Sequence, residues 1–528
     1  MRRLASLVVA ACALMPASAG AATRYVTPTG ADSGRCDRSA PCTIAYAVNG
    51  DGSRAGDTVV LLRGTYTDQP IVLSRSLTVT GPEAGGRPVL STTQPGGAAL
   101  TVADGGAGSL VSHMEIRASG DGTTGVDITG TVALEDLAVS TASGPCLHST
   151  AVGVRIDDSS FTTGAVSDGV CLQTTGDDTE YDDISVTAVN TATAGSMTGN
   201  GKVIDSTFTG QTTGLELAGK PDAHRVTAIG AQRGLLLSGA TTITDSVAIA
   251  RGGGTALFAG SGSHQLLNIT AWGEGEGSIG VRAVNGAQLT VQNTIARGEA
   301  ADLQADPATQ TITTDCAAFT GCPGGQMTVD HSNFVTATGI TDNGMNSHRD
   351  PKFVDAAFEN FHLRRGSPAI DAGGFEFNAG SADRDGRYRW LGKAPDMGAY
   401  EYPTPRPVPH KADRIAPRLA NVILTPTRFR VTHSGSAFAA SSIPRGTTLS
   451  FHVDEDSDLV LNVSRRRRGA PVIGTIVRPF RRGPHRMTIS GELNHGFLAP
   501  GSYVLTVIAR DVAQNLSRER RIPFTVVR

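Results

Sequence analysis

Two similar phrases lie in the middle of the chain: GPCLHS at residues 144–149 and GVCLQT at residues 169–174. Each places a cysteine directly before a leucine, and the two cysteines, Cys146 and Cys171, are 25 residues apart. A short phrase that returns at such a distance is typical of a repeat architecture, in which each copy is one supersecondary unit. The flanking sequence should therefore contain further copies of this unit.

Two other patterns supply those copies. Asp or Asn, two further residues and an apolar residue recur at steps of 20 to 25 residues, with Arg225 once in place of the acid. Between the copies runs the phrase Gly-apolar-x-apolar, from GVDI at Gly125, through GVCL at Gly169, to GVRA at Gly280. Each unit therefore holds at least two short alternating strands joined by turns. The first pattern begins at Asp136, Asp158, Asp183, Asp205, Asp245, Asn268 and Asn293.

A unit of this length cannot bury its own apolar face, so stacked neighbours must form a common core. Leucine-rich repeats need a framework of Leu and Asn that is missing, and propeller blades are about twice as long. Short strands with β-branched residues and polar turns predict a parallel β-helix, in which like positions of successive coils form columns. The recurring Asp and Asn are then expected to form a stacked turn ladder.

The cysteines are expected to form disulfides within this fold. Cys146 and Cys171 would lie on adjacent coils, within the ~4.4–6.8 Å between Cα atoms that a disulfide needs. If Leu147 and Leu172 point inward, strand alternation predicts that the cysteines point outward. Zinc is the alternative for the set, but no Cys-x-x-Cys pair is present. Proximity predicts the pairs Cys36–Cys42, Cys146–Cys171 and Cys316–Cys322.

The first 22 residues, MRRLASLVVAACALMPASAGAA, have the pattern of a secretory signal peptide. A basic start precedes an apolar stretch, and Ala17-Ser18-Ala19 offers small residues for cleavage. One alternative is a membrane anchor, although the apolar run is shorter than the ~20 residues that a span needs. Another is a lipoprotein signal with Cys12 as the acylated residue. The chain is therefore expected to be secreted or at the cell surface, without a transmembrane segment in its mature form.

Segments on both sides of the repeat resemble a known family. They are similar to the opening and closing segments of secreted bacterial right-handed parallel β-helix proteins of the pectate-lyase-like superfamily. The resemblance implies a right-handed β-helix over residues 23–402 with a closing cap at 350–402. It implies no single activity, because the superfamily includes lyases, hydrolases, epimerases and adhesins. The segments are YVTPTGAD (25–32), PCTIAYAVN (41–49), AGDTVVLLRGTY (55–66), SLTVTG (76–81), DPKFVDAAFENFHLRRGSPAIDAG (350–373) and DRDGRYRWLGKAPDMGAYEY (383–402).

The composition changes after residue 402. Residues 403–417 carry five prolines and are predicted to be a stiff linker. Alternating strands over residues 418–528 predict a small immunoglobulin-like β-sandwich, so the whole chain is predicted to be all-β. The phrase ARDVAQNLS (509–517) resembles the turn before the last strand of bacterial immunoglobulin-like modules, with Gln514 in place of the usual glycine.

Charge also divides the chain. Residues 403–528 hold 20 Lys and Arg against 8 Asp and Glu, a balance of +12, whereas residues 1–402 carry −15. A dense arginine cluster could hold an anionic polymer of the cell wall or an acidic polysaccharide, and a solvated loop is the alternative. Nucleic acid is not an expected partner, because the sequence contains no recognition motif. The cluster comprises Arg465, Arg466, Arg467, Arg468, Arg481 and Arg482.

An acidic stretch, GDDTEYDD, offers the best metal candidate. Calcium takes six to eight oxygen ligands, and five carboxylates lie within this stretch. A solvated turn is the alternative. His224 and His264 are isolated in the sequence and are expected to be surface residues, and no catalytic residue can be assigned. The calcium candidates are Asp177, Asp178, Glu180, Asp182 and Asp183.

Together these patterns predict an exported protein that interacts with extracellular polysaccharide or with the cell envelope. The long β-helix face would bind the polymer, and the basic sandwich would serve as an attachment module. One alternative is a polysaccharide lyase or glycoside hydrolase, which requires Asp and Lys or Arg side chains from three adjacent coils in one groove. The other is a structural or adhesive protein with no sugar site and a featureless outer face.

Overall fold

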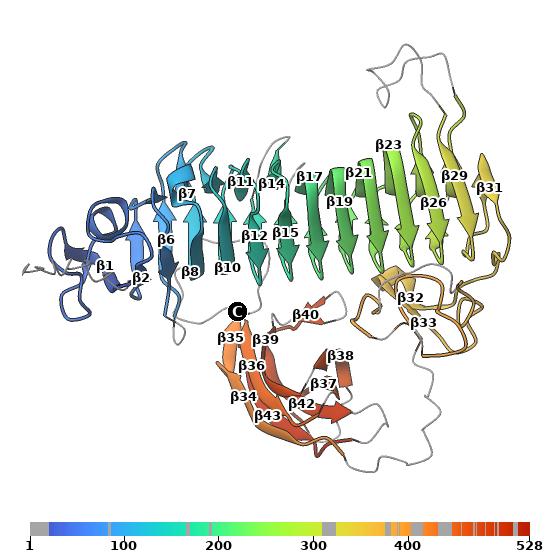
Figure 1. Ribbon diagram of the computed structural model, residues 1–528. Helices are drawn as coiled ribbons and strands as arrows, with labels where there is room; N and C mark the ends of the chain where they lie inside the picture. Colours follow the sequence, from blue (N-terminus) through green and yellow to red (C-terminus); the bar gives the residue numbers. More distant parts are fainter. Residues whose placement is uncertain are drawn as a thin grey trace, which may run out of the picture.

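The computed structural model describes the greater part of the chain (Figure 1). Cys316, Cys322, Arg468, Arg481 and the first 20 residues lie outside the described part, as does most of the predicted linker. The described residues are 21–82, 86–164, 169–189, 193–308, 324–374, 382–387, 389, 391–402, 416–430, 446–455, 457–467, 470, 472–480, 482–489, 492–493, 496–510 and 516–527. Within these residues, no helix is long and apolar enough to cross a membrane.

Residues 23–342 form a parallel β-helix, in which successive coils stack along one axis (Figure 1). The strands lie in three columns, each hydrogen-bonded to the same column of the next coil. The first sheet contains β1 (Thr23–Ala31), β2 (Thr58–Leu61), β5 (Thr78–Thr80), β8 (Ser109–Ala118), β10 (Val132–Thr141), β12 (Arg155–Asp157), β15 (Thr179–Asp182), β17 (Thr193–Ile204), β19 (Thr213–His224), β21 (Arg233–Thr244), β23 (Thr255–Leu267), β26 (Gln288–Gln292), β29 (Gln326–Asp330) and β31 (Ile340–Asp342).

The second and third sheets complete each coil. The second also contains the C-terminal halves of β8 and β10, and the third contains the N-terminal halves of β17, β19, β21 and β23. Second-sheet strands are β3 (Thr65–Thr67), β6 (Val89–Thr92), β13 (Ser160–Thr163), β16 (Ser185–Ala188), β18 (Thr207–Thr209), β20 (Thr227–Gly230), β22 (Val247–Ala250), β24 (Thr270–Gly273) and β27 (Ile295–Arg297). Third-sheet strands are β4 (Ile71–Leu73), β7 (Ala98–Val102), β9 (Thr124–Ile128), β11 (Leu147–Ser149), β14 (Val170–Thr174), β25 (Ile279–Ala283), β28 (Ala301–Ala305) and β30 (Ala337–Thr338).

The repeated Asp and Asn form the corner between the first and second sheets. One residue of each coil there adopts the left-handed conformation, with φ between 44° and 57°. Asp and Asn tolerate this conformation better than other non-glycine residues, which explains the repeated motif. The predicted turn ladder is therefore confirmed. Its members are His113, Asp136, Asp158, Asp183, Asp205, Arg225, Asp245, Asn268, Asn293 and His331.

A column of buried hydroxyls follows this ladder by one residue. Ser246, for example, donates to the Thr244 carbonyl and accepts the backbone N–H of Val226 on the preceding coil, at 2.7 and 2.9 Å. From Ser159 to Thr294 these hydroxyls alternate with aliphatic side chains on the coils between them, whereas Ser332 accepts the backbone N–H of Thr294 on the coil directly before it. Equivalent pairs of hydrogen bonds are made by Ser159, Ser206, Thr294 and Ser332.

The Cys146–Cys171 disulfide joins adjacent coils, with 4.7 Å between the Cα atoms, as predicted. The expectation that these cysteines point outward is wrong, because both are fully buried together with the leucines that follow them. The register runs from Val170↔Thr193 directly to Leu172↔Gly195, so the strand bends at Cys171 and two consecutive side chains face the core.

Register also corrects the alignment of the repeated phrases. Val126 pairs with Leu147, and Leu147 pairs with Leu172. Cys171, and not Gly169, therefore occupies the place of Gly125, and the phrase GVCL is two residues out of register with GVDI. A Cβ atom at Gly125 would meet the Val139 side chain at 2.6 Å, so this corner of the core requires a small residue or a disulfide.

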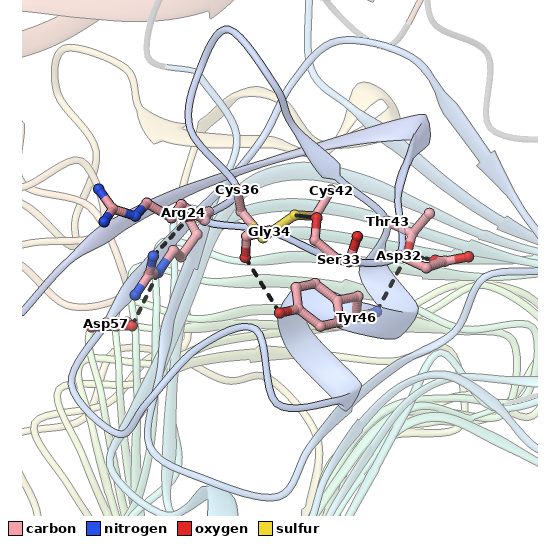
Figure 2. Close-up of a disulfide and its surroundings, with 10 residues drawn as sticks. Arg24, Asp32, Ser33, Gly34, Cys36, Cys42, Thr43, Tyr46 and Asp57 are labelled. Carbon is pink, nitrogen blue, oxygen red and sulfur yellow. Dashed lines mark hydrogen bonds and ion pairs between the residues drawn. A yellow bond between two sulfur atoms is a disulfide. The ribbon is translucent and has the colours of Figure 1, made fainter.

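The N-terminal coil is closed by a short helical turn and a second disulfide. The turn η1 (Ala45–Asn49) buries Ala47 and Val48 against the first coils. Figure 2 shows the Cys36–Cys42 disulfide next to this turn, where the Tyr46 hydroxyl donates to the Gly34 carbonyl at 3.3 Å. The two Cα atoms are 4.9 Å apart, so this predicted pair is also confirmed. A further short turn, η2 (Asp104–Gly106), lies between β7 and β8.

The described residues of the closing segment pack along the side of the β-helix. This segment contains β32 (Phe353–Asp355), the turn η4 (Ala356–Phe358) and β33 (Asn360–Leu363). Its apolar residues, including Phe353 and Phe361, cover Ile229, Val247 and Ile249 on the outer face of the second sheet. Figure 1 shows β32 and β33 beside the β-helix. These outward side chains of the second sheet are apolar and need cover, and the predicted cap over residues 350–402 stays a prediction.

The C-terminal residues form two main sheets with a core of their own, and their strands pair antiparallel except for the parallel pair β35–β43. Phe429, Leu449, Leu461 and Tyr503 from both sheets meet in this core, as expected for a β-sandwich. The all-β class is confirmed, whereas the immunoglobulin-like type and the domain boundaries stay predictions. One sheet contains β34 (Leu419–Thr425), β36 (Thr447–Val453) and β39 (Gly483–Ile489), and the other β35 (Arg428–Arg430), β43 (Arg520–Val527), β42 (Gly501–Arg510), β37 (Ser457–Arg465) and β38 (Val472–Phe480); β40 (Glu492–Leu493) pairs with β41 (Gly496–Phe497).

Candidate functional site

The outer face of the third sheet presents one straight row of side chains. Parallel register places one outward residue per coil directly above the next, at the ~4.8 Å spacing of neighbouring strands. The residues on either side of most members point into the core, as Val126 and Ile128 do beside Asp127. The outward row begins at Val72 and continues with Thr101, Asp127, His148, Gln173, Ser196, Glu216, Leu236, Phe258, Arg282, Gln304 and Thr338.

Two neighbours in the outward row form a carboxylate–imidazole pair. His148 Nδ1 donates to Asp127 Oδ1 at 3.0 Å, and the two side chains are 42% and 40% exposed. The carboxylate orients the ring and fixes the proton on Nδ1, which leaves Nε2 to accept a proton or a hydrogen bond from a ligand. This pair has the chemistry of a general base, and solvent can reach it.

Sequence reasoning missed this pair, although both residues belong to quoted phrases. His148 follows Cys146 and Leu147 in GPCLHS, and Asp127 follows Gly125 and Val126 in GVDI. Once the cysteine is aligned with the glycine, the histidine and the aspartate fall on the same outward position. The two-residue error in the alignment of GVCL concealed that signal.

Further along the outward row, charged and aromatic groups pack together. The Arg233 guanidinium lies 4.7 Å from the Phe258 ring centroid, and that of Arg282 lies at 5.8 Å. Phe258 is only 5% exposed, although it points outward. Arg282 forms an ion pair with Asp306 at 2.5 Å. Burial raises the pKa of Glu216, and the Arg233 charge offsets part of this rise.

The predicted calcium ligands do not meet at one point. Asp177 and Asp178 lie before β15, and Asp177 Oδ1 accepts the Asn200 backbone N–H at 2.8 Å. Asp182 ends the strand, and Asp183 occupies the corner ladder beyond it. Among the described residues, no group of three or more His, Cys, Asp or Glu side chains could hold a metal ion. A calcium site at these five carboxylates stays a prediction.

Acidic side chains are nevertheless concentrated along the corner ladder. Partial desolvation and the neighbouring carboxylates of Asp136, Asp183 and Asp157 raise the pKa of Asp158 to about 6. Desolvation and nearby carboxylates also raise the pKa of Asp182. Asp205 is the last acid of the ladder before Arg225. Its negative charge is balanced by the Arg225 guanidinium, which donates to both carboxylate oxygens at 2.6 and 2.7 Å.

The described arginines of the predicted polyanion-binding set lie near opposite ends of β37. Arg465 ends β37, and its guanidinium lies 4.7 Å from the Tyr503 ring centroid. Arg466 and Arg467 follow in the loop after β37. Arg482 lies two residues beyond Phe480, which pairs with Ser457 at the other end of that strand. Polyanion binding by this set stays a prediction.

His264 and His224 are both hydrogen-bonded within the β-helix. His264 is 2% exposed and bonds to the Thr241 hydroxyl and the Ser261 carbonyl at 2.8 and 2.7 Å, so the expectation of a surface histidine is wrong. It lies in the first-sheet part of β23, where its ring fills the space beside Thr241. His224 is partly buried beside the Thr244 hydroxyl. Burial lowers the pKa of both rings.

No protein-family model matches the sequence, and no curated protein does. Similar solved structures include the A-module of the mannuronan C-5 epimerase AlgE4 of Azotobacter vinelandii, at 12% identity and TM-score 0.38, covering 56% of this chain and 91% of that one. Tailspike protein 2 of bacteriophage CBA120 is 10% identical, with TM-score 0.36 and coverage of 95% and 76%. The GH136 lacto-N-biosidase of Eubacterium ramulus is 12% identical, with TM-score 0.24 and coverage of 51% and 64%. Similarity of this degree transfers neither an activity nor a site to this chain.

Proposed function

We propose that this protein is exported and binds an extracellular polysaccharide or a cell-envelope polymer along the outward row of the third sheet. The observation that carries the proposal is the unbroken register of that row from Thr101 to Thr338. A straight column of equally spaced side chains matches an extended polymer better than a compact ligand. Repeated weak contacts along such a column would add up to useful affinity.

The composition of the outward row supports a carbohydrate ligand. Gln173 and Gln304 offer amide donors and acceptors, and Asp127 and Glu216 offer carboxylate acceptors for hydroxyl groups. Leu236 adds apolar surface between them. A purely structural protein with a featureless outer face would not need this succession of hydrogen-bonding groups.

Two observations support export. The Cys36–Cys42 and Cys146–Cys171 disulfides are typical of proteins that mature in an oxidising compartment. The first 22 residues have the composition of a signal peptide. The excess of arginine after residue 402 supports a role for the C-terminal part in holding an anionic polymer of the envelope.

A second candidate function is catalysis at Asp127 and His148. His148 Nε2 would take the proton from the carbon next to the carboxyl group of a uronic acid. A carbon–carbon double bond then forms, the glycosidic C–O bond breaks, and the departing oxygen takes a proton from water. The arginines near this row, Arg233 and Arg282, belong to coils far from Asp127. Within the outward row, the convergence of Asp with Lys or Arg from three adjacent coils is therefore absent, and we favour binding.

A panel of polymers tests both functions. The purified full chain is titrated calorimetrically with polygalacturonate, alginate and dextran, while the absorbance of unsaturated products and the release of reducing ends are followed. The proposal predicts saturable binding to at least one polymer. Binding to none of a wide panel would refute it.

The catalytic candidate makes a separate prediction for His148. If the protein is a lyase, His148→Gln should lower the rate of product formation by about 100-fold or more, because glutamine cannot take up the proton. Affinity for the polymer should change little, since glutamine keeps a hydrogen-bonding group. Equal rates for the variant and the natural protein would exclude His148 as the base.

A further inference from the structure

The C-terminal part contains a cleft that is separate from the predicted arginine cluster. It has a volume of about 820 Å³ and lies where β34 begins, β36 ends and the chain enters β43. The two sheets meet there, because Arg520 Nη2 donates to the Leu419 carbonyl at 3.4 Å. The lining includes Arg418, Arg518, Arg520, His452, Asp454 and Leu516.

The charge of this cleft is strongly unbalanced. Arg418, Arg518 and Arg520 are exposed at its rim, and Asp454 is the one acid among the residues that line it. Asp454 Oδ1 accepts a hydrogen bond from the backbone N–H of Arg418 at 2.7 Å, so part of the hydrogen-bonding capacity of this carboxylate is used by the backbone. In the part of the chain that the structure describes, none of the three guanidiniums is within ion-pair distance of a carboxylate.

Three guanidiniums around one concavity repel one another, and a bound anion would relieve that repulsion. Each guanidinium can donate two parallel hydrogen bonds to a carboxylate or a phosphate. The exposed Leu516, at 57%, offers an apolar contact at the same place. The arrangement fits a ligand that combines an acidic group with a less polar body, as an acidic sugar residue does.

We propose that this cleft binds the acidic group, a carboxylate or a phosphate, of an anionic glycopolymer. The inference rests on the proposed function, for which it locates the attachment site of the C-terminal part. It assigns that site to the cleft and not to Arg465–Arg467, where one guanidinium already lies against Tyr503.

The test compares two double variants of the full chain. Arg418→Gln with Arg518→Gln removes two cleft charges whose side chains make no hydrogen bond or ion pair within the described residues. Arg466→Gln with Arg467→Gln is the matched control, with the same loss of charge on the same part of the chain. Calorimetric titration uses polygalacturonate as the carboxylate probe, sodium polyphosphate as the phosphate probe and dextran as the neutral probe, at low and high salt.

We expect the cleft variant to bind at least one anionic probe about tenfold or more weakly, with a reduced dependence on salt. The control should change affinity by less than about twofold, as its arginines are solvated. Loss confined to polyphosphate would assign a phosphate ligand, and loss confined to polygalacturonate a carboxylate ligand. Equal affinities for the cleft variant and the natural protein, an equal loss in the control, or no binding of either anion would overturn the inference. Binding to the outward row of the β-helix is measured separately, with dextran and with variants of that row. If the cleft proves not to bind an anion, the proposed function is therefore still open to its own test.

Discussion

Cys146 and Cys171 occupy the inward corner at which most other coils have Gly or Ala, whereas one later coil has Asp302. Ala194 and Ala256 are fully buried at this corner, so alanine fits there without a disulfide. The double variant Cys146→Ala with Cys171→Ala should therefore lose only the covalent link. For a closed loop of this length, the expected cost is about 3 kcal/mol of unfolding free energy. Urea denaturation measures it, and an unchanged midpoint would show that the link contributes nothing.

The column of hydroxyls makes a second prediction at the level of single residues. Ser246→Ala leaves the buried Val226 N–H without its acceptor and should cost about 1–3 kcal/mol. Ser185→Ala, at an exposed position of β16, is the control and should cost less than about 0.5 kcal/mol. Equal losses in the two variants would mean that the buried hydroxyl is not a specific coil-to-coil contact.

At the level of elements, the closing segment is held to the β-helix by a buried group of ionisable side chains. The Arg389 guanidinium donates to Asp245 at 2.8 Å, lies 3.6 Å from Glu401, and all three side chains are 1–2% exposed. Desolvation raises the pKa of Asp383 to about 6, with a further contribution from Asp385. Burial also raises the pKa of Asp396, and burial together with the Asp396 carboxylate raises that of Glu401.

These raised pKa values predict that the closing segment loosens at alkaline pH. A carboxyl group whose pKa is higher in the folded state favours folding when it is protonated. Its contribution is complete below the ordinary carboxyl range and is lost as the pH rises through the raised values. Hydrogen exchange of residues 350–374 should therefore accelerate from pH 6 to pH 9 beyond the intrinsic rate, and less so in Glu401→Gln. Loosening on acidification instead would contradict this account.

The sequence predicted those features that depend on the type and spacing of individual residues. The turn ladder at Asp136 or Asn268 follows from one residue type, the Cys146–Cys171 disulfide follows from coil stacking, and the Cys36–Cys42 disulfide follows from proximity in the sequence. The position of the closing segment did not follow, because it depends on which face of the second sheet carries Ile229 and Ile249. The Asp127–His148 pair was missed because GVCL was aligned with GVDI by its glycine, whereas the paired strands place Cys171, two residues later, at the position of Gly125.

At the scale of the whole molecule, the coils form a straight scaffold that repeats one outward position over the length of the third sheet. The β-helix part carries the negative charge of the chain and the C-terminal part carries the positive charge. Long-range attraction should therefore bring an anionic polymer first to the C-terminal part. The outward row of the third sheet would then act through short-range hydrogen bonds.

The most direct test of the central claim blocks that row in its middle. Gln173→Trp places a large side chain between His148 and Ser196, whereas Thr187→Trp places the same side chain on the outer face of the second sheet. With the polymer that the natural protein binds best, calorimetry should show at least about tenfold weaker binding for Gln173→Trp and an unchanged affinity for Thr187→Trp. Thermal melting checks that both variants are folded. Unchanged binding by a folded Gln173→Trp protein, or an equal loss in both variants, would contradict the claim that the third sheet holds the polymer.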